Sequence, residues 1–285
     1  MISRPWALAV LAALLGFGLA YWRVIEKLVY DWGHDDNYSH GFFIVPLALY
    51  FAWERRGAVR ATPARPSALG LLAIAGSLAV LIVGTLGAEL FLTRVSIVGM
   101  AIGLTMFVGG GAHLRILAFP ISFLLLMIPL PAIVFNEIAF PLQLLASRCG
   151  EWALQALSIP VLREGNVIVL ANTTLEVAEA CSGIRSLVSL LTLGIVLGYF
   201  SDERGWTRVA IAACTVPVAI AANGIRVAGT GVAAAYVGPD AATGFLHTFS
   251  GWLMFVLAFG LLLAVQQLIF RFFPVPARPR GEVAP

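Results

Sequence analysis

Residues 179–200 read EACSGIRSLVSLLTLGIVLGYF and join a cysteine to a long apolar segment. The apolar part, 183–200, has the length and composition of a helix that crosses the roughly 30 Å hydrocarbon core of a membrane. Cys181 therefore lies at the mouth of a membrane span, at the boundary between lipid and water.

The composition of the whole chain predicts a membrane protein. Hydrophobic residues make up 60% of the 285 residues, charged residues only 12%, and the mean hydropathy is +0.93. A typical soluble domain has about 25% charged residues. The apolar segments long enough to be candidate spans are 5–22, 38–53, 67–87, 91–110, 115–130, 183–200, 206–225 and 248–270. We expect an all-α polytopic membrane helical bundle with about eight transmembrane helices, of which 38–53 and 115–130 are short.

Arginines predict the orientation, because short cytoplasmic loops collect Lys and Arg. They gather at four places that fall on one side of the bundle: Arg55, Arg56, Arg60 and Arg65; Arg115; Arg204 and Arg208; and Arg271, Arg278 and Arg280. Both termini are then cytoplasmic, and the outward segments are 23–37, 88–90, 131–182 and 226–247. The net charge of +3 reflects this orientation, and no clustered basic stripe suggests nucleic acid.

The outward stretch 131–182 is the only extended one that does not span. Its first part, 131–158, mixes apolar and polar residues and suits helices at the interface or against the bundle. Its later part has two β-branched runs, 165–170 and 173–178, which predict a small outward β-hairpin that delivers the chain into Cys181.

We expect residues 1–273 to form a single transmembrane domain and 274–285 to form a disordered cytoplasmic tail. The first span is expected to be retained, because no clean small-residue cleavage site precedes Tyr21. The small-residue pairs Gly99/Gly103 and Gly194/Gly198 predict close helix contacts inside the bundle.

Cys181 is a candidate nucleophile. A free thiol has a pKa of about 8.5, so only a few per cent is thiolate at neutral pH. A helix that starts near Ser182 or Gly183 would stabilise the thiolate through its unpaired N–H groups. The alternatives are a small buried residue or a disulfide with Cys149. For Cys214, inside a span, packing is the preferred interpretation.

Arg226 ends an apolar segment, where an unpaired guanidinium costs roughly 2.5–3.5 kcal/mol at membrane depth. It could donate hydrogen bonds to the oxyanion that forms when a thiolate attacks a peptide carbonyl. The alternative is an arginine that reaches the lipid headgroups. Arg185 is a competing donor that could instead bind Glu179 or a substrate acid.

His247 directly precedes the last span, and its ordinary pKa of about 6.5 suits proton transfer. A structural role is the alternative. His40 is its rival, although we expect Asn37, Tyr38 and His40 to position substrate or support a lid. We predict no metal site and no cofactor, since the acidic and histidine residues at 34–36 lack a second set of ligands.

Four motifs together resemble the exosortase/archaeosortase family, and the similarity covers nearly the whole chain. They are EACSGIR at 179–185, NGIR at 223–226, HTFSGW at 247–252 and NYSHG at 37–41. The resemblance implies a membrane-embedded cysteine transpeptidase, which processes exported proteins that end in a Pro-Glu-Pro sorting signal, a transmembrane helix and a basic tail. It also implies that Cys181, Arg226 and His247 are catalytic.

We therefore expect a thiol protease or transpeptidase at the outer face of a bacterial inner membrane, acting through a thioester. Its partners would be exported proteins, membrane lipid, and a lipid, glycan, amine or water acceptor. The expected supporting residues are Glu179, Ser182, Gly183, Arg185, Asn223, Asn37, Tyr38 and His40, and Arg163, Arg185 or Arg226 would bind the acid of the signal. A membrane transporter or polysaccharide-export component is the alternative, but a transporter should show repeated halves.

Overall fold

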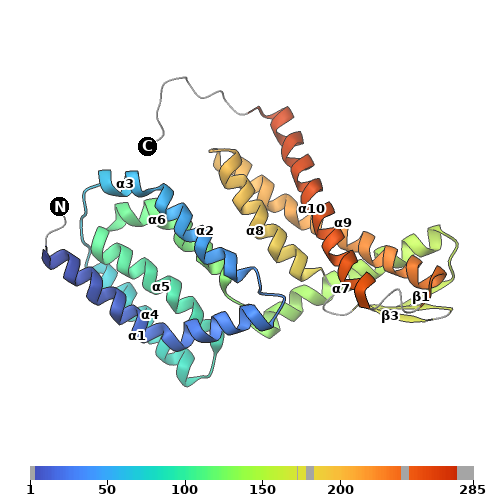
Figure 1. Cartoon of the computed structure of the whole chain (residues 1–285), viewed down its shortest axis with the longest axis horizontal. Coiled ribbons are helices and arrows are strands. Elements are labelled where there is room, and N and C mark those ends of the chain that lie inside the picture. The colour runs from blue at the N-terminus through green and yellow to red at the C-terminus, as the bar shows by residue number, and fades with distance from the viewer. Residues whose placement is uncertain (1–3, 172, 178–182, 239–243, 275–285) are drawn as a thin grey trace. The chain divides into compact units, whose positions relative to one another are not determined.

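The computed structural model describes residues 4–171, 173–177, 183–238 and 244–274, without the side chains of 4–14 and 244–248. The chain divides into two compact units, with the boundary between Pro131 and Ala132 (Figure 1). The expected tail after Pro274 lies outside the described residues, so its disorder stays a prediction.

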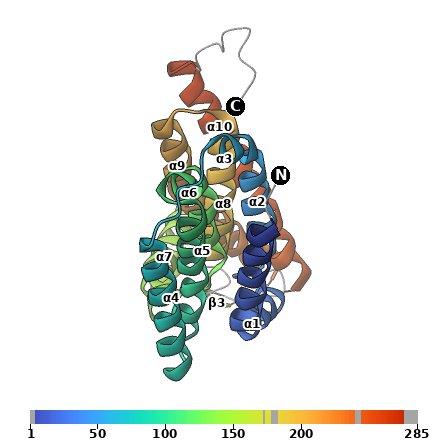
Figure 2. The same ribbon diagram turned by 90° about the vertical axis from the view of Figure 1, so that its left-hand side faces the viewer.

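Unit 1 consists of helices. They are α1 (Arg4–His34), α2 (Gly41–Glu54), α3 (Arg56–Ala61), α4 (Leu69–Leu86), α5 (Leu90–Gly109), α6 (Gly111–Phe123) and the 3-10 turn η1 (Leu124–Met127). Helices α4 and α5 form a tightly packed pair (Figure 2). Gly110 separates α5 from α6 at a φ of 81°, and a Cβ atom there would lie 2.0 Å from the carbonyl oxygen of Arg65. Only glycine fits this turn.

Unit 2 combines helices with a small sheet. Its elements are α7 (Ala132–Ala156), β1 (Val161–Glu164), β2 (Val167–Leu170), β3 (Thr174–Glu176), α8 (Ile184–Ser201), α9 (Gly205–Tyr236) and α10 (Gly244–Phe272). The antiparallel sheet has the order β1-β2-β3, and Ile168 lies opposite Leu175. The sheet packs on α7 and α9 around the buried side chains of Leu154, Ile168 and Val227. Helix α9 contacts α7, α8 and α10.

The helical membrane bundle is confirmed. Among the described residues, five helices are long and apolar enough to cross a membrane: Leu69–Leu86, Leu90–Gly109, Ile184–Ser201, Gly205–Tyr236 and Phe249–Phe272. They correspond to five of the expected spans. Helices α2 and α6 replace the expected spans 38–53 and 115–130 and have only 14 and 13 residues. At about 1.5 Å per residue, each is about 10 Å too short to cross alone.

The helices expected over 131–158, at the interface or against the bundle, are one 25-residue helix, α7, which packs against α9. Two expected boundaries are wrong. Helix α9 continues ten residues beyond Arg226, because the following residues up to Tyr236 are small or apolar and include no proline. Helix α1 runs to His34, so most of the expected outward loop 23–37 is helical.

The hairpin before Cys181 is confirmed as β2 and β3, and β1 adds a strand that we did not expect. The glycine pairs also lie where we expected them. Cβ atoms at Gly99 and Gly103 would approach α4, at 2.5 Å from Ser77 and 2.8 Å from Ile74. Those at Gly194 and Gly198 would approach α9. The pairs serve contacts between helices of one chain.

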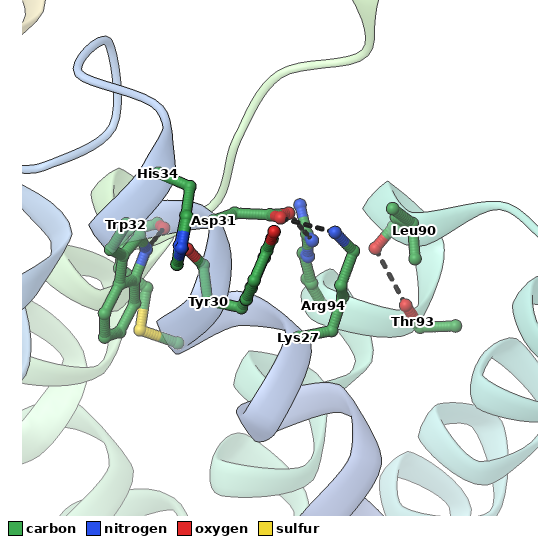
Figure 3. Close-up of polar contacts among 9 residues, drawn as sticks. Lys27, Tyr30, Asp31, Trp32, His34, Leu90, Thr93 and Arg94 are labelled. Atoms are coloured by element: carbon green, nitrogen blue, oxygen red, sulfur yellow. Dashed lines mark hydrogen bonds and ion pairs between the residues drawn. The ribbon is translucent and has the colours of Figure 1, made fainter.

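A charged cluster joins α1 to α5 in unit 1 (Figure 3). Arg94 lies in the first turns of α5 with 3% of its surface exposed, and its Nη2 donates to Oδ2 of Asp31. Nζ of Lys27 binds the other oxygen of Asp31 at 2.6 Å. Burial raises the pKa of Asp31, but the hydrogen bonds from Lys27 and Arg94 outweigh it and lower the pKa below its usual value. Asp31 is therefore ionised at neutral pH and compensates the buried guanidinium.

Replacing Asp31 should destabilise the protein because it leaves the Arg94 charge buried and unpaired. We expect Asp31→Asn to lower the free energy of unfolding by about 3 kcal/mol, measured by denaturation in detergent. The control is Glu26→Gln, since Glu26 is exposed and its ion pair with Arg23 is long, at 3.4 Å, and also exposed. An equal, small loss in both variants would contradict a stabilising role for the buried pair.

Candidate active site

One turn of α9, Asn223 to Arg226, is the centre of the candidate site. Asn223 is buried, with 7% of its surface exposed, and it faces the start of α8. Gly183 precedes α8 at a φ of 78°, and a Cβ atom there would lie 2.7 Å from Cγ of Asn223. Gly183 therefore lies directly against this turn of α9, and both its positive φ and the close approach require a glycine.

The side chain of Arg226 lies against Gly251 of α10. A Cβ atom at Gly251 would lie 3.2 Å from Nη2 and 3.4 Å from Cζ of Arg226. Arg226 is partly buried, three residues after Asn223 on the same helix. Position 247 is one turn before Gly251, and residues four apart share a helix face. Helix α10 thus brings position 247 to the face that contacts Arg226.

Helix α7 packs on another side of the same turn. A Cβ atom at Gly224 would lie 3.0 Å from Cβ and 3.3 Å from Sγ of Cys149, and one at Gly150 would lie 2.8 Å from Val227. Cys149 and Cys214 are free cysteines. Cys149 serves helix packing here, as we expected for Cys214.

A narrow pocket opens beside Gly183 and Asn223. Its volume is about 10 Å³, close to the space that one water molecule needs. Its other lining residues are Leu142, Ala146, Leu187, Ala219 and Ile220, from α7, α8 and α9. The polar face of Asn223 therefore adjoins an otherwise apolar pocket.

The structure describes only some of the predicted site residues. Glu179, Cys181 and Ser182 lie outside the described residues, as does the side chain of His247. Gly183, Asn223 and Arg226 lie together, whereas Arg185 is exposed in the first turn of α8.

Arg163 lies on β1 and already holds a partner. Its Nε binds Oε2 of Glu151 at 2.7 Å, and its Nη1 donates to the carbonyl oxygen of Gly165 at 2.8 Å. These contacts fasten the β1–β2 turn to α7.

Asn37, Tyr38 and His40 form the turn between α1 and α2 in unit 1. The backbone N–H groups of Asn37 and Tyr38 donate to Asp35. Nε2 of His40 lies 3.1 Å from the carbonyl oxygen of Leu126. Because a carbonyl only accepts, Nε2 must carry the proton, and this His40 nitrogen holds η1 in place. Trp32 does the same for Met127, at 2.9 Å.

The ion pair of Asp31 with Arg94 was not expected from the sequence. Its signal was Arg94, the fourth residue of the apolar segment 91–110, because an arginine there costs free energy unless a partner is near. Its partner lies 63 residues earlier, and no local pattern connects the two.

The fold and the candidate site define a multi-pass helical membrane protein with a polar site where α8, α9 and α10 meet. A family profile described as transmembrane exosortase matches residues 32–264. The chain belongs to this family, whose members are membrane-embedded sorting enzymes. No curated protein and no solved structure matches the chain significantly.

A methyl group at Gly251 should impair the enzyme without unfolding it. The new Cβ of Gly251→Ala would press on the Arg226 guanidinium, and displacing this candidate catalytic group by a few tenths of an ångström should slow sorting on the order of tenfold. The measurement is the rate at which a sorting-signal protein is shortened in cells. Gly260→Ala is the matched control, because Gly260 lies on the same helix and a Cβ atom there would have no atom within 4 Å. Equal rates in the two variants would contradict a role for the Arg226–Gly251 contact.

Proposed function

We propose that this exosortase is a cysteine protease or transpeptidase that cleaves the Pro-Glu-Pro sorting signal of exported proteins through a thioester on Cys181. The observation that carries the proposal is the pair of close contacts, Gly183 with Asn223 and Gly251 with Arg226. Cys181 precedes Gly183 by two residues, so its Cα atom cannot be more than about 7 Å from that of Gly183. The thiol, the guanidinium and the imidazole then belong to one site.

In the first half of the reaction, the Cys181 thiolate attacks the carbonyl carbon of the scissile peptide bond. Arg226 donates hydrogen bonds to the oxyanion. The C–N bond breaks as the protonated His247 gives its proton to the departing amine, which leaves with the hydrophobic tail. The N–H groups at the start of α8 favour the thiolate over the thiol.

In the second half, an acceptor attacks the thioester. Neutral His247 takes the proton of the attacking water, amine or hydroxyl group, and the Cys181 thiolate leaves. Water gives hydrolysis, whereas an amine, lipid or glycan gives transfer. The same residues serve both halves, with the protonation of His247 reversed.

Arginine placement supports an outward-facing site in a bacterial inner membrane. The short loop between α2 and α4 holds Arg55, Arg56, Arg60 and Arg65, which favours its cytoplasmic location. Counting α4, α5 and one further span made by the helices between Gly111 and Ala156 puts the start of α8 on the outer side. Such a site meets the junction between an exported domain and its anchoring helix, so the scissile bond should lie just before that helix.

The acid of the signal needs a cationic partner near the membrane. Of the three arginines considered, Arg185 is exposed in the first turn of α8 and lies four residues after Cys181. The proposal therefore gives this role to Arg185 and keeps Arg226 for the oxyanion.

Cysteine replacements test the nucleophile. Cys181→Ala and Cys181→Ser should abolish processing, because alanine has no nucleophile and the serine hydroxyl is hardly ionised at neutral pH. Cys149→Ala should process normally, since Cys149 is a free, packing cysteine. His247→Ala should lose more activity than His40→Ala, whose imidazole holds η1. The assay is shortening of a co-expressed reporter at matched expression levels. Full activity of Cys181→Ser would refute the thiolate mechanism.

Reporter variants test recognition of the signal. A Glu-to-Gln change in the reporter's Pro-Glu-Pro motif should reduce processing by about tenfold, because a charge-assisted hydrogen bond worth roughly 1.5 kcal/mol is weakened. In Arg185→Gln, the Glu and Gln reporters should differ much less. A scrambled motif that is cut as fast as the natural one would refute recognition of the signal while leaving the cysteine chemistry possible.

A further inference from the structure

A polar groove lies in unit 2, between α7, the β1–β2 turn and strand β3. Its volume is about 580 Å³, within the range of ligand sites in proteins. Its polar lining residues are Asn136, Glu137 and Gln143 from α7, Asn166 from the β1–β2 turn and Glu176 from β3. None of them belongs to the candidate active site.

The floor of the groove carries side-chain amides, which are groups suited to a polypeptide backbone. Gln143 is buried, with 7% of its surface exposed, and its Oε1 accepts from Nδ2 of Asn166 at 3.5 Å. Asn166 also donates to the carbonyl oxygen of Val177 at 3.3 Å. Side-chain amides carry both donors and acceptors, as peptide groups do. Phe140 adds an apolar wall.

Strand β3 presents an open edge beside this groove. The sheet order is β1-β2-β3, so among the described residues no strand pairs with the outer side of β3. The hydrogen bonds from Leu170 to Thr173 and from Val177 to Asn166 show that residues 173, 175 and 177 face β2. Since antiparallel strands alternate their bonding residues, Thr174 and Glu176 direct their N–H and C=O groups outward. An extended peptide can pair with these groups.

The rim of the groove is acidic. Glu137 and Glu176 are both exposed, and no ion pair among the described residues neutralises either one. Two neighbouring carboxylates favour a basic segment and repel an acidic one. A Pro-Glu-Pro motif is unsuitable here, because its acid is repelled and proline has no N–H to donate.

We propose that this groove and the free edge of β3 bind the extended segment of the exported protein that lies just before the sorting signal. This inference rests on the proposed function and adds a recognition site to it. Glu176 is five residues before Cys181, so the chain between them spans at most about 17 Å. The same distance holds about five extended residues of substrate. The groove therefore binds a short segment next to the signal and prefers basic or neutral residues in that segment.

Binding can be tested without cleavage. In the Cys181→Ala protein, a photo-crosslinking residue at Thr174 should capture a reporter within the segment before the signal. Leu162 is the matched control, since it is exposed on β1 and does not line the groove. Capture from position 174 but not from 162 supports the proposal. Equal capture from both positions, or none from 174, overturns it.

Charge reversal tests the preference in the active enzyme. A reporter with two lysines in the five residues before the signal should be cut severalfold faster than one with two glutamates. The Glu137→Lys/Glu176→Lys protein should cut the glutamate reporter faster than the lysine reporter. The control Glu164→Lys, on β1, should still cut the lysine reporter faster. A proline scan of the segment should impair cleavage at alternate positions, because every second N–H bonds to β3. If cleavage rates do not change with the charge or proline substitutions, the groove proposal is wrong. If no reporter is cleaved at all, the proposed function is refuted, and the crosslinking experiment then tests the groove on its own.

Discussion

The close approach of glycine backbones to one turn of α9 is the constraint on which the site depends. Between Asn223 and Val227, that turn contacts the start of α8 at Gly183, α10 at Gly251 and α7 at Gly150. Lipid is as apolar as leucine, so helices in a membrane associate through close packing and polar contacts. Glycines allow both the close packing and the polar contacts, since the helices can approach until the side chains of Asn223 and Arg226 lie between them. Any larger residue at these places would separate the parts of the site.

Ion pairs also stabilise the contacts between elements in both units. Arg94 is paired with Asp31 in unit 1, and Arg163 with Glu151 in unit 2. Each pair joins two elements, α1 to α5 and β1 to the preceding helix α7. An isolated guanidinium near lipid is costly, so each acid stabilises its arginine and thereby holds two elements together. Arg163 is thus occupied with structure, although its sequence position had suggested a contact with substrate.

Much of the fold could be predicted because membrane spans are local. Long apolar runs predicted five helices that are long and apolar enough to cross a membrane. The glycine pairs predicted the contacts between α4 and α5 and between α8 and α9, and the β-branched runs predicted the β2–β3 hairpin. The wrong ends of α1 and α9 share one cause, which is that charge was taken to end a helix. Arg226 does not end α9, because the ten residues that follow it contain no proline. The pair of Asp31 with Arg94 could not be predicted, since it depends on tertiary packing across 63 residues. For the site, Gly183 lies against Asn223 and Gly251 against Arg226, so three of the sequence motifs contain residues that lie near one turn of α9, and their roles in the reaction stay predictions.

The central claim is a covalent acyl-enzyme on Cys181, and mass spectrometry can test it directly. Membranes that contain the enzyme and a reporter with a slowly cleaved signal would be quenched in acid and digested, and the peptide that contains Cys181 would be weighed. A thioester should appear as that peptide joined to the new C-terminal end of the reporter, should be released by hydroxylamine, and should be absent from Cys181→Ala. Reporter cleavage with Cys181 unmodified at every time point, or with the acyl group on another residue, would contradict the account.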